Sequence, residues 1–402
     1  MFSIEKALRR LIPGRSREPG AFAEISQVYD AEGFVAQGFG TFEETNVFQP
    51  VISDTGFTDM QGGEFYRLKS YTPATRSLLR IANADIYFPN IVITNNALLN
   101  VNNGYTSTER IRQRASISPL RQIDGRLIVD SETDIVRTAS GCYLAADENY
   151  SAWLLGEIPR IQNYLRNSGA SSQIILHGDV RQFHLDSLAA YGVSRDRVTV
   201  VEPRARILAR DILFATPGYF HHIPSPDAVN FLTGISLDLP QTALRKIYIS
   251  RSRTGMRKIR NEAELERSLR GEGYEIVFPE GLAFTQQAAM FRNADIIVAP
   301  FGAALANLVY VAPGCRVVLI TTKFTLEFAR LLQMRSINFF VFNGLARNWS
   351  RYLAPRRIRE RHTEYLLDIG RLIAGLRQLA IGNTSSRDNG AIYRSHRQLR
   401  RR

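Results

Sequence analysis

Polar and small residues follow three successive predicted strands in the second half of the chain, and their types suit an anion. The loop "SRSRTGMRK" after the first of these strands carries Arg251, Ser252 and Arg253. The third strand runs into Pro-Phe-Gly-Ala-Ala, where Gly302 precedes an expected helix. The first N–H groups of a helix lack internal partners and attract negative charge, and guanidinium groups fork onto phosphate oxygens. The two loops together predict a diphosphate site.

Three further residues complete this set. Glu280 follows the second strand and is placed to accept hydrogen bonds from ribose hydroxyls. Phe301 and Ala303 flank the glycine of the turn, and the phenyl ring suits either stacking on a sugar or nucleobase or plugging the pocket. Taken alone, the arginine loop is equally well explained as a solvated surface, and the glycine turn as tight strand–helix packing. Their coincidence in one sheet favours a ligand.

The elements that position these loops alternate between strand and helix. Apolar runs predict strands at 246–250, 274–278, 295–299, 316–320 and 337–342. Helices are expected from Asn261, where Glu264 has capping-box spacing, and around 285–293, 303–311 and 325–333. Strands that alternate with helices across short connections predict a parallel sheet covered on both faces, with ligands at the carboxyl ends of the strands.

In the first half of the chain, the residue composition and the spacing of apolar residues change along the sequence. Residues 22–145 are rich in Gly, Asn and Thr and predict a β-rich section, with turns at 102–104 and 124–125. From about residue 147 the spacing becomes helical, and Pro159 predicts a kink in the first helix. A strand, a helix and a strand follow, before the Pro- and Gly-punctuated segment 223–240, the expected linker. The fold class predicted is α/β, with two Rossmann-like halves facing a cleft.

Bulk composition narrows the class of protein. A chain of 402 residues exceeds the usual size of one hydrophobic core, so more than one domain is expected. Cys142 and Cys315 form no disulfide framework, which fits a reducing compartment. The first residues do not read as a secretory signal, and no apolar run is long enough for a spanning helix. A cytoplasmic protein is expected.

The formal net charge of +13 is concentrated in the tail. Residues 351–402 hold 13 Arg and no Lys against four acidic residues, giving +9 and leaving +4 for the rest. Such a tail suits a solvated end or contact with an anionic membrane. Residues 1–21 read as an amphipathic interfacial helix or a flexible terminus. The last part of the tail, residues 387–402, has a lone Tyr393 for base stacking, so a specific nucleic-acid partner is not expected.

Several of these segments resemble glycosyltransferase family 61. The likeness lies in "RKIYISRS", in "YEIVFPEGLAFTQQAAMFRNADIIVAPFGAALANLVYVAPG" and in "NYSAWLLGEIPRI", and covers roughly residues 145–325. The resemblance implies a GT-B fold, a nucleotide-sugar donor (a UDP-sugar is expected), a saccharide or lipid-linked saccharide acceptor, and inversion without an obligatory metal or cofactor. The domains implied are 22–240 on the acceptor side, 241–350 for the donor, and 351–402 as a basic helix and tail.

The resemblance also assigns residues. On the donor side it implies Arg251, Glu280, Gly302, Ala303, Leu305 and Asn307, to which we add Ser252, Arg253 and Phe301 from their loops. On the acceptor side it implies Asn149, Trp153, Pro159 and Arg160. Arg251 is expected to stabilise the leaving diphosphate.

Two positions depart from the family pattern. Ala152 and Phe301 stand where the pattern has histidine, which puts a base at 152 in doubt. An inverting transferase needs a general base on the acceptor hydroxyl. Glu157 is the candidate base, with the pair 147–148 and the histidines at 177, 221 and 222 as alternatives. No HxxxH, DxD or cysteine cluster predicts a metal site.

The function predicted is sugar transfer to a saccharide acceptor in surface or capsular polysaccharide biosynthesis, near the inner face of the membrane. The alternative is a non-catalytic relative that binds a nucleotide or sugar as a partner subunit, because both pattern histidines are replaced.

Overall fold

The structure is a computed structural model that describes most of the chain between residues 78 and 320 and shorter segments on either side. The described ranges are 24–25, 51–52, 57–59, 78–94, 97–99, 120–123, 126–129, 133–167, 172–215, 219–220, 223–224, 226–234, 245–255, 257–320, 328, 331–332, 335, 337–342 and 366–381. The predictions for residues 1–21, the turn at 102–104, the histidines at 221 and 222 and the basic residues after 381 lie outside these ranges.

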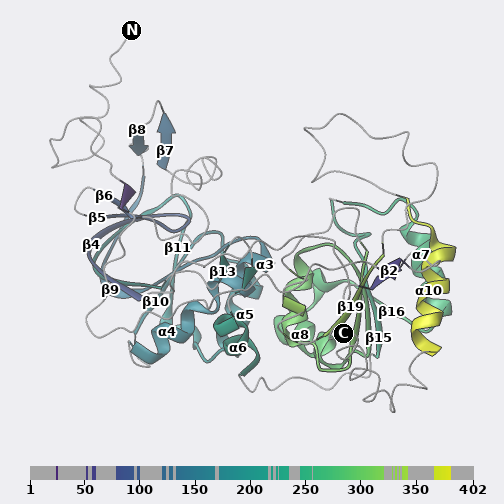
Figure 1. Ribbon diagram of the computed structural model, residues 1–402. Coiled ribbons are helices and arrows are strands. Elements are labelled where there is room, and N and C mark those ends of the chain that lie inside the picture. The colour runs from purple at the N-terminus through teal and green to yellow at the C-terminus, as the bar shows by residue number, and fades with distance from the viewer. Residues whose placement is uncertain are drawn as a thin grey trace, which may run out of the picture.

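The described elements gather around two large sheets, which form two lobes (Figure 1). The first sheet has the order β1-β6-β5-β4-β12-β9-β10-β11. Its strands are β1 (Glu24–Ile25), β4 (Leu78–Tyr87), β5 (Ile91–Thr94), β6 (Ala97–Leu99), β9 (Ile135–Ala145), β10 (Ile174–His177), β11 (Val198–Val201) and β12 (Arg206–Ala215). Strands β12, β9, β10 and β11 run parallel, whereas β12–β4, β4–β5 and β5–β6 are antiparallel.

The first sheet is therefore mixed, and only its parallel side matches the predicted Rossmann-like half. The antiparallel side comes from the section predicted to be β-rich, where short strands joined by turns favour antiparallel pairing. A separate hairpin, β7 (Leu120–Ile123) with β8 (Arg126–Val129), pairs across the predicted turn at 124–125. Two short strands, β13 (Tyr219–Phe220) and β14 (Ile223–Pro224), also pair. The α/β class is confirmed.

Helices of the first lobe follow its parallel strands. They are α3 (Tyr150–Ala152), the π-helix η1 (Trp153–Glu157), α4 (Arg160–Asn167), α5 (Gln182–Ala190), the 3-10 turn η2 (Arg195–Arg197) and α6 (Pro226–Gly234). The break between η1 and α4 falls at Pro159, as the sequence predicts, because proline cannot continue the helical hydrogen bonds.

The expected linker contains a packed helix instead. Helix α6 buries Ala228, Val229 and Leu232, and the hydroxyl of Tyr191 donates a hydrogen bond to the carbonyl of Leu232. The Pro and Gly residues of this segment predict a linker from the sequence alone. Those residues mark the start and end of a short helix, where both are common.

The second sheet has the order β16-β15-β17-β18-β19-β3-β2. Its strands are β2 (Val51–Ile52), β3 (Phe57–Asp59), β15 (Lys246–Ile249), β16 (Glu275–Val277), β17 (Ile296–Pro300), β18 (Arg316–Ile320) and β19 (Asn338–Phe342). The five strands from β15 to β19 are parallel, which confirms the predicted alternation. Strands β2 and β3 join antiparallel from the front of the chain, so residues 51–52 and 57–59 lie on the second sheet, across the expected boundary at 240.

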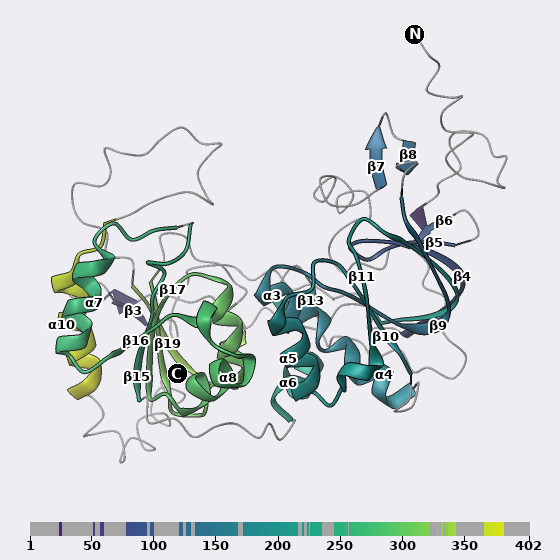
Figure 2. The same cartoon turned by 180° about the vertical axis from the view of Figure 1, so that it is seen from behind.

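Helices cover both faces of the second sheet (Figures 1 and 2). One face carries α7 (Glu262–Gly271) and α10 (Ile369–Ile381), which bury Leu265, Leu269, Leu372 and Leu376 against the strands. The other face carries α8 (Phe284–Asn293) and the 3-10 helix η4 (Ala303–Tyr310), with the short 3-10 turn η3 (Pro279–Gly281) after β16. Strands β17 and β18 are almost wholly buried, as expected for parallel strands covered on two sides.

The predicted capping box at the start of α7 is wrong. The side chain of Asn261 makes no hydrogen bond to the first turn of the helix. It pairs instead with the backbone of Leu367, donating to the carbonyl at 2.9 Å and accepting from the N–H at 3.0 Å. Asn261 thus ties the segment before α10 to the second lobe.

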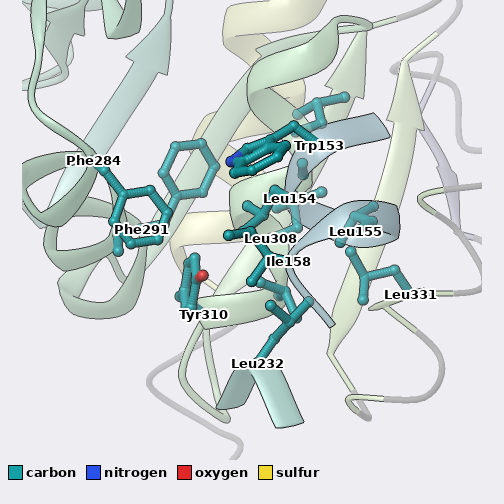
Figure 3. Packing of buried hydrophobic residues seen from close by; sticks show 14 of the residues in the cluster. Trp153, Leu154, Leu155, Ile158, Leu232, Phe284, Phe291, Leu308, Tyr310 and Leu331 are labelled. Carbon is teal, nitrogen blue, oxygen red and sulfur yellow. The ribbon is translucent and has the colours of Figure 1, made fainter. Parts of the chain in front are cut away.

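A single apolar cluster joins the two lobes (Figure 3). Trp153 and Leu154 from η1, and Leu232 from α6, belong to the same buried cluster as Phe284 of α8 and Leu308 of η4. These side chains are each 0 % exposed. Burying each of them contributes roughly 1.5–3 kcal/mol, so the interface holds the lobes together in the way a domain core does.

Candidate donor-binding and acceptor-side residues

The candidate site lies where the order of the second sheet reverses. The chain leaves β15 for β16 on one side and later returns to β17 on the other. Strands β15 and β17 are neighbours, and the loops that follow them lead in opposite directions along the sheet. Ligands of open α/β sheets bind between two such loops, at the carboxyl ends of the strands. The structure places the two predicted loops, after Ile249 and after Pro300, at this switch point.

The guanidinium of Arg251 lies directly over the backbone of Gly302. A Cβ atom at position 302 would overlap Nη1 of Arg251 and would lie 3.3 Å from its Cζ. The φ of Gly302 is −175°, an extended conformation open to any residue. A side chain at position 302 would therefore have to displace the guanidinium of Arg251. The contact brings together two of the predicted site residues from loops 51 positions apart in the sequence.

Two buried carboxylates from α7 hold the turn that carries Arg251. Oε1 of Glu262 accepts from the backbone N–H of Arg251 at 2.7 Å, and Oε1 of Glu266 accepts from the hydroxyls of Ser250 at 2.7 Å and Ser252 at 3.1 Å. Burial raises the pKa of Glu262. Neither carboxylate is among the residues selected from the sequence. Their four-residue spacing on the helix after the loop places both on one helix face, and this pattern could have identified them.

Arg257 is a second cation at the same turn. Its Cζ lies 5.0 Å from the ring centroid of Phe301, and its Nη1 donates to the Phe301 carbonyl at 3.3 Å. The ring of Phe301 also contacts that of Phe328, with the ring centroids 5.4 Å apart. Phe301 is thus packed beside Arg257 and Phe328 and is half-buried. Arg257 adopts a positive φ of 55°, an uncommon conformation for a non-glycine residue.

The remaining residues of the two loops lie at the same sheet edge. Ser252 and Arg253 are exposed, and the Cζ of Arg253 stacks 3.8 Å from the ring centroid of Phe278, at the end of the neighbouring β16. Glu280 follows on η3 and is also exposed. The three predicted strand ends are therefore adjacent, because β16, β15 and β17 are neighbours in the sheet.

The predicted residues on η4 differ in exposure. Ala303 is half-buried at the start of the helix, whereas Leu305 is buried in the apolar cluster that joins the lobes. Asn307 is 0 % exposed and lies between the lobes: its Oδ1 accepts from the hydroxyl of Tyr150 at 2.7 Å, and its Nδ2 donates to Gln287 at 3.1 Å. Leu305 and Asn307 thus have structural partners in the folded protein.

The predicted acceptor-side residues have similar partners. Asn149 is exposed and caps α3, its Oδ1 accepting from the N–H groups of Ser151 and Ala152. Trp153 is fully buried and donates its indole N–H to the hydroxyl of Ser187 at 2.8 Å. These contacts place Trp153 in the core between the lobes rather than on a surface.

Glu157 and Arg160 form a buried ion pair. Oε2 of Glu157 accepts from Nη1 of Arg160 at 2.5 Å and from the backbone N–H of Ala145 at 3.1 Å, and Oε1 accepts from Asn90 at 3.0 Å. Nη1 of Arg160 also donates to Asn90 at 2.8 Å, and its guanidinium lies over Phe214. The assignment of Glu157 as base stays a prediction, and its contacts favour a structural role.

The alternative bases have contrasting surroundings. His177 is 0 % exposed, and burial lowers its pKa to about 4; its Nε2 lies 3.1 Å from the carbonyl of Ala205. Asp147 is buried and accepts from the backbone N–H of Asn149 at 2.9 Å. Glu148 is exposed at the carboxyl end of β9, 3.5 Å from Nη2 of Arg181.

Two further features concern partners and cofactors. Within the described part of the chain, no helix combines the length and apolar character that crossing a bilayer requires. The same residues bring no three His, Cys, Asp or Glu side chains into an arrangement that could hold a metal ion.

The comparison with protein families agrees with the geometry. No curated protein matches the chain. The family described as glycosyltransferase 61 matches residues 84–318, a span that contains the parallel side of the first sheet, the lobe interface and the loops of Arg251 and Gly302. That span is more than half of the 402 residues. The chain therefore belongs to the glycosyltransferase 61 family, which supports the resemblance drawn from its motifs.

Proposed function

We propose that the protein transfers a sugar from a nucleotide-sugar donor to a saccharide acceptor, with inversion at the anomeric carbon and without an obligatory metal. The observation that carries the proposal is the contact of the Arg251 guanidinium with the Gly302 turn at the sheet's switch point. A guanidinium beside a close-approach glycine suits a diphosphate, because both bring hydrogen-bond donors to phosphate oxygens.

In this proposal the donor lies along the edge formed by β16, β15 and β17. Arg251 stabilises the leaving diphosphate, and Arg257, held at the same turn by Phe301, supplies a second positive charge. Glu280 accepts hydrogen bonds from the ribose. Ser252, Arg253 and Ala303 line the same edge, and a UDP-sugar is the proposed donor. The two lobes then correspond to a GT-B arrangement, with the acceptor on the first lobe.

We assign the base role to Glu148 in preference to Glu157. Glu157 already accepts three hydrogen bonds inside the first lobe. Glu148 is exposed at the carboxyl end of β9 and precedes α3, which packs against η4 through Tyr150 and Asn307. A general base must reach the acceptor hydroxyl, and an exposed carboxylate at the carboxyl end of β9 is accessible to an acceptor.

The cellular role proposed is surface or capsular polysaccharide assembly on the cytoplasmic side of the membrane. The net charge of +9 in residues 351–402 supports contact with anionic lipid, where lipid-linked acceptors lie.

A second candidate function is nucleotide or sugar binding without turnover. It is favoured by the packing of Phe301 against Arg257 and Phe328, which fills the turn with a phenyl ring. Release of UDP from UDP-sugars, with and without saccharide acceptors, separates the two. Turnover by the wild-type protein that falls at least about 100-fold in Glu148→Gln, with Glu157→Gln as the comparison, supports transfer through Glu148. Binding of UDP without turnover supports the second function.

A further inference from the structure

The turn that carries Arg251 is fixed from behind by helix α7. Glu262 and Glu266 lie four residues apart on this helix, so both carboxylates point from the same face. They are 3 % and 9 % exposed. The carboxylates are therefore part of the packed interior beside the turn, on a regular helix.

Each carboxylate holds a different part of the turn. Glu262 accepts from the backbone N–H of Arg251 at 2.7 Å and from the hydroxyl of Tyr248 at 2.9 Å, both through Oε1. Glu266 accepts from the hydroxyls on either side of Arg251, Ser250 and Ser252. The Ser250 hydroxyl also accepts from the N–H of Ser252 at 3.1 Å. Three successive residues of the turn, Ser250, Arg251 and Ser252, thus each donate a hydrogen bond to a carboxylate of α7.

The pattern of these bonds separates the backbone of Arg251 from its side chain. The main-chain N–H of Arg251 donates to Glu262, whereas the guanidinium lies over Gly302. Hydrogen bonds to a charged acceptor are shorter and stronger than neutral ones, so the backbone of Arg251 is held firmly. A side chain that starts from a fixed backbone loses less freedom when it meets a ligand.

We propose that Glu262, supported by Glu266, is a positioning residue that keeps the guanidinium of Arg251 over Gly302 for a diphosphate. The inference rests on the proposed function and adds to it a pair of residues that touch no substrate. Its role differs from that of a carboxylate that merely stabilises the first turn of α7, because it acts through the Arg251 backbone.

The test uses the full chain, inorganic pyrophosphate as the probe and two readouts. Hydrogen–deuterium exchange reports the Arg251 amide, and calorimetry reports pyrophosphate affinity. Glu262→Ala should expose the Arg251 amide to exchange and weaken pyrophosphate binding about 10-fold or more, since the guanidinium loses its fixed origin. Glu262→Gln keeps an oxygen acceptor and should restore both values to within about 3-fold of wild type.

Tyr248→Phe is the matched control. It removes a different donor to the same Glu262 oxygen and leaves the Arg251 bond in place, so it should lower stability while leaving pyrophosphate affinity unchanged. If Glu262→Ala does not fold, Ser250→Ala replaces it. Ser250 is buried, and its loss should weaken binding by removing one bond to Glu266.

The outcomes separate this inference from the proposed function. Unchanged exchange at Arg251, or faster exchange with unchanged pyrophosphate affinity, overturns the positioning role. A wild-type protein that binds no pyrophosphate overturns the proposed function, and the exchange data then decide by themselves whether Glu262 fixes the turn.

Discussion

Replacing Gly302 with alanine tests whether the space above this residue matters for binding. The added methyl group would overlap Nη1 of Arg251. To reach ordinary van der Waals contact, the guanidinium would have to move by roughly 1.5 Å. A movement of that size breaks a charge-assisted hydrogen bond to a phosphate oxygen, whose net value is about 1.5–3 kcal/mol. Binding of UDP should therefore weaken about 10- to 150-fold.

Stability should change little in the same variant. The φ of Gly302 is −175°, so alanine meets no backbone strain, and the group that must move is the end of a flexible side chain. Replacing glycine by alanine in a compatible conformation can stabilise by about 0.4–1 kcal/mol. Chemical denaturation of the wild type and of Gly302→Ala measures the change in the free energy of unfolding, and calorimetry with UDP measures the loss of affinity.

Gly255→Ala is the matched control for this experiment. Gly255 lies in the same loop as Arg251, and nothing approaches within 4 Å of a Cβ at that position. Its UDP affinity should equal that of the wild type. Equal affinity of Gly302→Ala and wild type would refute the reasoning, because the guanidinium would then not be held at the place where the ligand binds.

Three further predictions concern the first lobe and the interface. Glu157→Gln should destabilise the protein by about 3–5 kcal/mol in denaturant titrations, because Arg160 stays buried without its counter-charge; a loss of activity without a loss of stability would contradict the structural role. Since the pKa of His177 is lowered to about 4, the free energy of unfolding should fall by on the order of 3 kcal/mol as the pH drops from about 6.5 to 4. His177→Gln should reduce this dependence on pH; an unchanged dependence would count against burial of a neutral imidazole. Tyr150→Phe should cost about 1–3 kcal/mol in the same titrations, because the buried Oδ1 of Asn307 loses its donor; an unchanged midpoint would contradict a bond between the lobes.

The parallel part of the second sheet was predictable because its central strands, β17 and β18, are buried on both faces. Such strands appear in the sequence as continuous apolar runs, and "RVVLI" matches β18 residue for residue. The convergence of Arg251 and Gly302 was predictable for the same reason, since the carboxyl ends of parallel strands share one edge. The contact between the two residues depends on a side-chain conformation, which spacing does not encode.

Other features depended on long-range contacts. Strand β3 joins the second sheet by pairing with β19, more than 270 positions away, and β2 pairs with β3 in turn. No local sequence pattern reports a partner so distant in the chain. Asn261 has the spacing of a helix cap, but its side chain hydrogen-bonds to the backbone of Leu367 instead of to the first turn of α7. Trp153 has the position of a family motif residue, yet its large apolar surface places it in the core between the lobes.

The measurement that tests the central claim most directly is titration calorimetry of the full chain with UDP, GDP, CMP and their common sugar conjugates, repeated on Arg251→Ala. The proposed donor site predicts saturable binding of one nucleotide and its sugar conjugate, weakened at least about 10-fold in the variant. No binding of any of these by a folded wild-type protein, or equal affinity in Arg251→Ala, would contradict a donor site at the Arg251–Gly302 turn.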